Sequence, residues 1–342
     1  MSMSMTIVTG ASRAWTTTRR RDDDARVTTT GRRARRRDGV ARAFASDEGE
    51  NAAKKSEIAL ADVRKGRKIG SGSFGDVFEG AWRGRAVVLK EPRRLFGVYL
   101  GGGTFLEIEA ENNRRLRGCA SAATFLGVAG AYAYLVWEDE GRETLEDALG
   151  GGFASKLGCS TDEEAARKVA REMLKCVKDV HAKQFIHRDV KPNNLLITRG
   201  GKLKLIDFGG AADLKTGRNY DEDETVFDPT YGPPERYLKG KLSKVAKNKP
   251  DLFDAFSCGM TILQVSVPSF RKRGGMTAVR RDLKKFDYDC EAWRASLPER
   301  RQGEFAILDA NSGAGWKVVC GLVAPRDNRM SVSKALSSPF CK

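Results

Sequence analysis

The 342-residue sequence lacks the cysteine and histidine patterns of a metal site or a disulfide framework. Its seven cysteines are scattered, with no CxxC pair and no spacing to histidine that zinc ligation would need. An odd number of cysteines without a framework fits a reducing compartment, where thiols stay free. We therefore expect neither a zinc module nor a disulfide-stabilised scaffold.

A long hydrophobic run is also missing. The uncharged stretch at residues 120–137 is near the length of a membrane helix, but it is rich in Ala, Gly and Ser. Two buried strands joined by a turn at residues 127–130 explain this pattern better. We expect no transmembrane helix here.

Lysine is absent from residues 1–46, although arginine is abundant there. Eleven Arg and four Asp give this segment a net charge of +7, which leaves +9 of the total +16 for the remainder. The segment has the composition of an organelle transit peptide cut near residues 45–46, and the alternative is a disordered basic tail that binds anionic surfaces. The polar residues 47–61 are predicted to be a linker. No nucleic-acid module is visible, so we expect no nucleic-acid partner.

The remainder divides into a strand-rich part followed by a mostly helical part. The clearest helix covers residues 160–182, with Ser160 or Thr161 as its N-cap and Glu163 or Glu164 three residues on. Residues 251–267 predict a buried helix, because they are apolar on most sides. We predict an α+β fold with its two parts at 62–138 and 139–342.

Three glycines interrupt a strand-like pattern at Gly70, Gly72 and Gly75. Together with Val77 they fit G-x-G-x-x-G-x-V. Strand patterns lie on both sides, whereas the glycines of a dinucleotide-binding fold open a helix. A glycine hairpin whose backbone N–H groups close on phosphates suits the pattern better, although such a motif alone is weak evidence because glycine turns are common.

A lysine follows fifteen residues after the last of these glycines. Lys90 ends the pattern VVLK on a predicted strand and can bridge the α- and β-phosphates of a nucleotide; the alternative is an exposed strand lysine. A carboxylate partner is expected on the next helix, because phosphates alone would position the ammonium group poorly. Glu109 is preferred, since the apolar residues of its helix then face the core, and Glu107 and Glu111 remain alternatives.

The stretch HRDVKPNN fits the pattern H-R-D-x-K-x-x-N. Asp189 can accept the proton of a substrate hydroxyl, Lys191 can neutralise a moving γ-phosphate, and Asn194 can hold a metal ion. The sequence DFG follows, and its Asp207 can bridge Mg²⁺ to the phosphates. The catalytic candidates are therefore Asp189, Lys191 and Lys90, and the metal candidates are Asn194 and Asp207.

In this order and at these separations, the motifs resemble those of eukaryotic-type protein kinases over roughly residues 62–340. The resemblance implies the bilobal kinase fold, with a small antiparallel-sheet lobe and a larger helical lobe, and the cofactors ATP and Mg²⁺. It adds Val88, Trp137, Glu138 and Leu196 to the expected ATP-binding residues. Trp137 falls at the gatekeeper position, where a bulky side chain should close the pocket behind the adenine.

The resemblance also implies structural roles. His187 and Phe208 belong to the two catalytic motifs, and Asp254 corresponds to an aspartate that supports the catalytic-loop backbone. Glu235, in PPE, is expected to pair with Arg329. The position of the catalytic-loop lysine points to serine or threonine as the phosphate acceptor.

The segment between DFG and PPE corresponds to the activation segment. Arg188 is expected to pair with a phosphate on it, and Thr216, Tyr220 and Thr225 are the candidate sites. The acidic run at 221–224 either replaces that phosphate in part or is a solvated loop.

One position in this segment departs from the kinase pattern. When the sequence is aligned on Tyr231 and Glu235, Asp228 stands where Ser/Thr kinases carry a threonine beside the catalytic aspartate. Thr230 is near but out of register. The conformation of the substrate-docking loop therefore cannot be read from the kinase pattern.

Several C-terminal blocks, among them FDPTYGPPERYL and ANSGAGWKVVCGLVAPRDNRM, are similar to the thylakoid state-transition kinases of plants and green algae. This resemblance implies a chloroplast kinase that phosphorylates threonines of the light-harvesting antenna proteins of photosystem II. A sister group that acts on photosystem II core subunits is the alternative. Residues 47–66 contain neither the membrane helix nor the cysteine pair of that family, so contact with the thylakoid would be peripheral or absent.

Two other functions compete with that of an active protein kinase. A pseudokinase scaffold is disfavoured because all the catalytic and metal candidates are present. A small-molecule kinase of related fold is disfavoured by Glu235, Asp254 and the activation segment, which favour a protein substrate.

Overall fold

The computed structural model describes most of the chain after the predicted leader. The described ranges are 57–71, 75–92, 94–95, 98–99, 102–217, 228–237 and 249–342. The predicted leader at 1–46 lies outside them, as do Gly72, Tyr220, Thr225 and the acidic run at 221–224.

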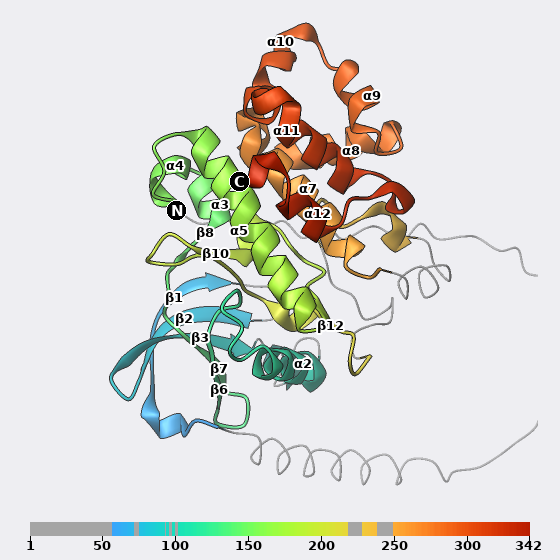
Figure 1. The fold of residues 1–342 in the computed structure, drawn as a ribbon. Helices are drawn as coiled ribbons and strands as arrows, with labels where there is room; N and C mark the ends of the chain where they lie inside the picture. Colours follow the sequence, from blue (N-terminus) through green and yellow to red (C-terminus); the bar gives the residue numbers. More distant parts are fainter. Residues whose placement is uncertain are drawn as a thin grey trace, which may run out of the picture. The chain divides into compact units, whose positions relative to one another are not determined.

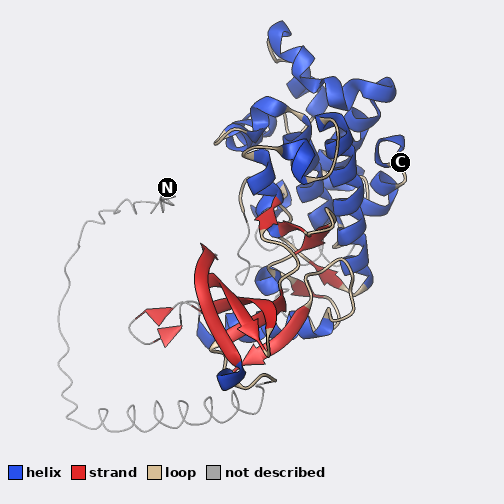
Figure 2. Ribbon diagram, turned by 90° about the vertical axis from the view of Figure 1, so that its left-hand side faces the viewer, coloured by secondary structure: helices blue, strands red, loops and turns tan. Residues whose placement is uncertain are grey.

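A five-stranded antiparallel sheet forms the N-terminal lobe (Figure 1; Figure 2). Alternating strand patterns separated by short turns favour this hairpin arrangement. Its strands run in the order β1 (Val63–Ser71), β2 (Gly75–Trp82), β3 (Arg85–Pro92), β7 (Tyr134–Glu138) and β6 (Phe125–Ala129).

Residues 120–137 contain the two expected strands, but the predicted turn at 127–130 is wrong. Gly127 lies inside β6 beside an irregularity in the pairing, and a Cβ atom there would lie 2.9 Å from the Glu57 carboxylate. The turn is at residues 130–133, where Gly130, Ala131 and Tyr132 have positive φ angles. Both glycines adopt conformations that favour glycine, so their presence alone does not locate the turn.

The helix α2 (Gly102–Arg115) lies against this sheet (Figure 1). Leu106 and Ala110 of the helix share a buried cluster with Phe125 and Leu135 of the sheet. A short ribbon of β4 (Arg94–Leu95) and β5 (Val98–Tyr99) precedes the helix. At the start of the lobe, Ile58 is buried and bridges to β6, so this part of the predicted linker contacts the sheet.

The C-terminal lobe is mostly helical (Figure 2). Its helices are α3 (Leu145–Leu149), α4 (Phe153–Lys156), α5 (Asp162–Ala182), α7 (Leu252–Ser266), α8 (Gly275–Lys285), α9 (Cys290–Ala295), α10 (Glu299–Gln302), α11 (Ala306–Val323) and α12 (Val332–Leu336). Its short strands are β8 (Glu143–Thr144), β9 (Phe185–Ile186), β10 (Leu195–Ile197), β11 (Leu203–Leu205) and β12 (Ala212–Asp213). A small antiparallel-sheet lobe followed by a larger helical lobe confirms the predicted α+β class.

The helix α5 begins at a capped residue, as the sequence predicts. The hydroxyl oxygen of Thr161 accepts a hydrogen bond from the Glu164 backbone N–H at 3.1 Å. The Glu164 carboxylate accepts one from the Ser160 backbone N–H at 2.8 Å. Both bonds satisfy N–H groups that the start of a helix would otherwise leave without partners.

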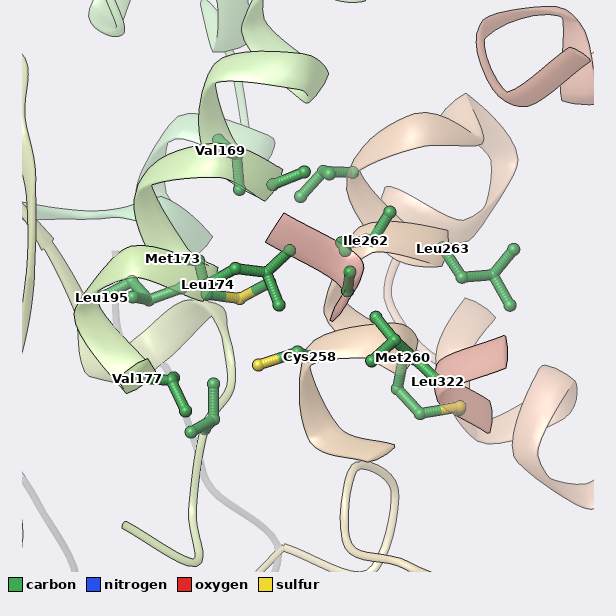
Figure 3. Close-up of a cluster of buried hydrophobic side chains, with 14 of the residues drawn as sticks. Val169, Met173, Leu174, Val177, Leu195, Cys258, Met260, Ile262, Leu263 and Leu322 are labelled. Carbon is green, nitrogen blue, oxygen red and sulfur yellow. The ribbon is translucent and has the colours of Figure 1, made fainter. Parts of the chain in front are cut away.

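The core of this lobe lies between α5, α7 and α11. Figure 3 shows Met173 and Leu174 of α5 on the side of α7, with Leu322 of α11 beyond. Among the described residues no helix is both long and apolar enough for a bilayer crossing. The predicted buried helix at 251–267 is confirmed as α7, which is the apolar centre of the lobe.

Replacing Met173 by alanine tests this core. Its side chain is fully buried, so we expect Met173→Ala to lower the free energy of unfolding by about 2–5 kcal/mol through lost burial and a cavity. Arg171→Ala, at an exposed position of the same helix, should change it by less than about 0.5 kcal/mol. Urea titration followed by circular dichroism measures both, and equal effects would contradict the packing described.

Candidate functional site

The glycine motif lies on the hairpin of β1 and β2. Gly70 pairs with Val77 and Ser71 pairs with Asp76, so strands flank the motif on both sides. A Cβ atom on Gly75 would lie 2.6 Å from the Glu91 carbonyl oxygen of β3, so only glycine fits at this position. The hairpin arrangement is the one that suits phosphate contact by backbone N–H groups.

Lys90 of β3 is held between two carboxylates from separate elements. Its Nζ atom lies 2.7 and 2.8 Å from the two carboxylate oxygens of Glu109 on α2, and 3.2 Å from Oδ1 of Asp207. Lys90 and Glu109 are both buried. Of the three glutamates considered on this helix, Glu109 is thus the one against Lys90, while Glu107 is exposed.

The charges of this cluster stabilise one another. Burial favours the neutral amine, but the carboxylates of Asp207 and Glu109 outweigh it and raise the pKa of Lys90 above its usual range. Burial raises the pKa of Glu109, and the Lys90 ammonium group opposes that rise. Burial also acts on Asp207, yet the charge of Lys90 lowers the pKa of this carboxyl group. Lys90 and Asp207 are therefore both charged at neutral pH.

Two asparagines that belong to none of the sequence motifs hold α2 in the position that this ion pair requires. Asn112 donates to the backbone oxygen of Phe208 at 2.9 Å and to that of Ala211 at 3.3 Å. The side-chain oxygen of Asn113 accepts the indole N–H of Trp137 at 3.2 Å. Both asparagines are buried, and their place three and four residues after a glutamate is the only sequence signal for their role.

Several residues expected to contact ATP lie on neighbouring strands. Val77 is paired with Lys90, and Val88 is paired with Trp137, whose ring lies 5.3 Å from that of Phe125. Glu138 ends β7. Leu196 belongs to a separate three-stranded sheet, in β10, directly after the catalytic loop.

The catalytic loop gathers three charged or polar side chains. Lys191 Nζ lies 2.9 Å from Oδ2 of Asp189. The amide nitrogen of Asn194 donates to the same oxygen and to the Asp189 backbone oxygen, at 2.8 Å each. Because this nitrogen is committed to Asp189, the amide oxygen of Asn194 is left for another ligand.

The backbone of this loop is anchored on Asp254 of α7, which is fully buried. Its carboxylate accepts the backbone N–H groups of His187 and Arg188 at 2.8 Å each, and His181 Nε2 lies 2.8 Å away. Burial disfavours the charge, but the hydrogen bond to His181 lowers the pKa of Asp254. The φ angle of Arg188 is +71°, which is costly for a residue with a side chain, so these bonds hold a strained turn.

His187 joins the two catalytic motifs through its ring. Its Nδ1 accepts the Asp189 backbone N–H at 3.3 Å, which leaves Nε2 to donate to the Ile206 backbone oxygen at 3.0 Å. The ring also packs edge-on against Phe208, with centroids 4.8 Å apart. These bonds assign the neutral ring with its proton on Nε2.

Glu235 and Arg329 form a buried ion pair. Nη2 of Arg329 lies 3.0 Å from Oε2 of Glu235, and Nη1 contacts the other carboxylate oxygen. Burial raises the pKa of Glu235, but the hydrogen bonds and charge of Arg329 lower it below the ordinary value of 4.5. This pair ties the end of the activation segment to the loop before α12.

Of the regulatory candidates, the structure describes Arg188 and Thr216. Arg188 is buried next to Asp189, whereas Thr216 is exposed. The hydroxyl of Thr216 donates to Asp213 at 2.6 Å, and Asp213 is also paired with Arg115 of α2. The start of the activation segment is thus linked to the helix that carries Glu109.

The metal candidates offer oxygen atoms only. Within the described ranges, no three His, Cys, Asp or Glu side chains gather as a metal cage would need. Mg²⁺ is commonly held by one or two protein oxygens together with substrate phosphates. Asp207 and the amide oxygen of Asn194 fit that use, and the Ile206 N–H to Asn194 carbonyl bond of 3.1 Å ties the two segments together.

Comparison with known proteins agrees with this geometry. The family described as the protein kinase domain matches residues 63–341. The chain belongs to the protein kinase family. The match covers both lobes and every candidate residue above.

Two relatives come from Arabidopsis thaliana, and both are named as chloroplastic serine/threonine-protein kinases. The kinase STN8 is 34% identical over 240 residues, which cover 60% of this chain and 48% of the relative. The kinase STN7 is 29% identical over 325 residues, which cover 82% of this chain and 57% of the relative. The chain thus spans about half the length of these curated relatives.

Removing the charge of Glu109 tests the first cluster. Glu109→Gln removes one of the two carboxylate charges at Lys90 and keeps that of Asp207, so we expect the phosphotransfer rate to fall about 100-fold, as when one preorganised group is removed from an active site. Glu107→Gln, on the exposed face of the same helix, should stay within about twofold of the parent. Initial rates with labelled ATP measure both, and similar rates for the two variants would refute the role of the pair.

The Glu235–Arg329 pair predicts a pH dependence of stability. Glu235→Gln leaves Arg329 buried without a charged partner and should cost about 3 kcal/mol at pH 7. Because the folded-state pKa of Glu235 is lowered, its contribution is complete above the unfolded value near 4.5 and is lost as the pH falls through the folded value. Urea titrations from pH 7 to pH 3 should show the gap between parent and variant closing only in acid. The exposed Glu299→Gln serves as control, and a gap independent of pH would contradict the assignment.

Proposed function

We propose that this protein is an ATP-dependent serine/threonine kinase of the chloroplast that phosphorylates threonines of photosystem II antenna proteins. The observation that supports kinase activity is the presence of two clusters of charged and polar side chains. One joins Lys90, Glu109 and Asp207, and the other joins Asp189, Lys191 and Asn194. A scaffold would not need both, since function is argued from the site and not from the fold.

The reaction is in-line transfer of the γ-phosphoryl group to a hydroxyl, and catalysis is mostly positioning and electrostatics. Lys90 holds the α- and β-phosphates by its charge, and Glu109 fixes the direction of its ammonium group. Asp189 orients the acceptor hydroxyl and accepts its proton. Lys191, beside Asp189, places a positive charge where the transferred group gains negative charge.

Asp207 and Asn194 would hold Mg²⁺, which supplies charge neutralisation at the phosphates when it is bound. The backbone N–H groups around Gly70 and Gly75 would close over the phosphates. Trp137, held by Asn113, would limit the depth of the adenine pocket. In this proposal Asp189, Lys191 and Lys90 each have a different role in the reaction.

The substrate and location rest on sequence similarity. The names of both relatives place them in the chloroplast, and the C-terminal blocks resemble state-transition kinases. The free cysteines and the Arg-rich segment agree with that compartment. The proposal includes a peripheral contact with the thylakoid, through basic residues on anionic lipid, or no contact at all. Core subunits of photosystem II are the alternative substrate.

The experiment incubates the full chain with isolated thylakoids, Mg²⁺ and ATP labelled in the γ-phosphate. We expect label on antenna threonines. Asp189→Asn should reduce it at least about 100-fold, because the variant removes the proton acceptor. Label mainly on core subunits would refute the antenna proteins as substrates and support the core subunits instead. No label with the parent protein, although ATP binds, would refute the kinase activity and favour a scaffold.

A further inference from the structure

Asp228 lies beside the catalytic aspartate, at the position where the kinase pattern has a threonine. Its backbone N–H donates to Oδ1 of Asp189 at 3.1 Å. The other carboxylate oxygen of Asp189, Oδ2, is taken by Lys191 and Asn194. The backbone of Asp228 therefore helps to fix the orientation of the Asp189 carboxylate.

The two side-chain oxygens of Asp228 have different partners. Oδ1 accepts the Thr230 backbone N–H at 2.8 Å, which closes a local turn. Oδ2 lies 3.7 Å from Lys191 Nζ, a charge contact longer than a hydrogen bond. The backbone oxygen of Asp228 accepts the N–H of Gly232 at 3.0 Å. One residue thus shapes the turn before Glu235 and reaches the catalytic lysine.

A carboxylate can accept the Thr230 N–H with one oxygen and attract Lys191 with the other. A hydroxyl group or an amide cannot make both contacts equally well. A threonine has a single side-chain oxygen to divide between the turn and the lysine. An asparagine could keep the turn with its oxygen, but its NH₂ group would then face the ammonium group of Lys191, donor against donor. The aspartate also adds a negative charge beside Lys191 that neither substitute has.

We infer that Asp228 is a positioning residue for phosphoryl transfer and that it acts by holding Lys191 in place. The inference rests on the proposed kinase function. When Asp189 accepts the proton of the acceptor hydroxyl, its attraction for Lys191 falls. The Asp228 carboxylate takes no part in that proton transfer and holds the lysine beside the transferred group. The contact is thus needed in the transition state and not for binding ATP.

The test is a double-mutant cycle between Asp228 and Lys191 in the full chain. Asp228→Asn should lower kcat about tenfold and leave the KM for ATP within about twofold, because contacting charged residues are coupled at this order of magnitude. With Lys191→Ala already present, the same substitution should change kcat by less than about twofold. Asp287→Asn, an exposed carboxylate in the turn after α8, is the matched control.

The thermal midpoints separate this role from a structural one. Asp228→Asn keeps an acceptor for Thr230, so its midpoint should stay near that of the parent, while Asp228→Ala should lower it by losing the turn. An equal loss of kcat with and without Lys191, no loss of kcat, or a midpoint for Asp228→Asn as low as that for Asp228→Ala would each overturn the inference. A parent protein that transfers no phosphate would overturn the proposed function, and this role with it.

Discussion

The catalytic loop depends on one buried carboxylate. Asp254 belongs to α7, in the middle of the C-terminal core, and it accepts two backbone N–H groups of the loop. Burying a charge is costly unless it is paired, and here His181 and the N–H groups stabilise it. The strained φ of Arg188 persists because this anchor belongs to a helix that is buried along almost its whole length. The core therefore positions the residues of the candidate site directly.

Side chains of α2 make polar contacts with residues of both lobes. Glu109 pairs with Lys90 of the sheet, while Asn112 of the next helical turn is bonded to the backbone at Phe208. Arg115, at the end of the helix, is paired with Asp213 of the activation segment. One helix thus contacts both the strand that carries Lys90 and the start of the activation segment.

The motif residues could be predicted from the sequence, because each carries a chemical type at a fixed spacing. Glu109 could be chosen among three glutamates because only one helical face points inward. The contacts of Asn112 and Asn113 could not be predicted, because they depend on segments far along the chain. The turn at residues 130–133 was misplaced because a glycine in an irregular strand and a glycine in a turn look alike locally.

The two lysines of the candidate site share a common arrangement. Lys90 lies between Glu109 and Asp207, and Lys191 lies between Asp189 and Asp228. In each pair one carboxylate has a second duty: Asp207 is the proposed metal ligand and Asp189 the proposed proton acceptor. The other carboxylate, Glu109 or Asp228, has no proposed part in the chemistry, and its proposed role is to hold its lysine in place. A cation that must stay fixed while its neighbours react needs such a partner, because side-chain freedom alone would let it move.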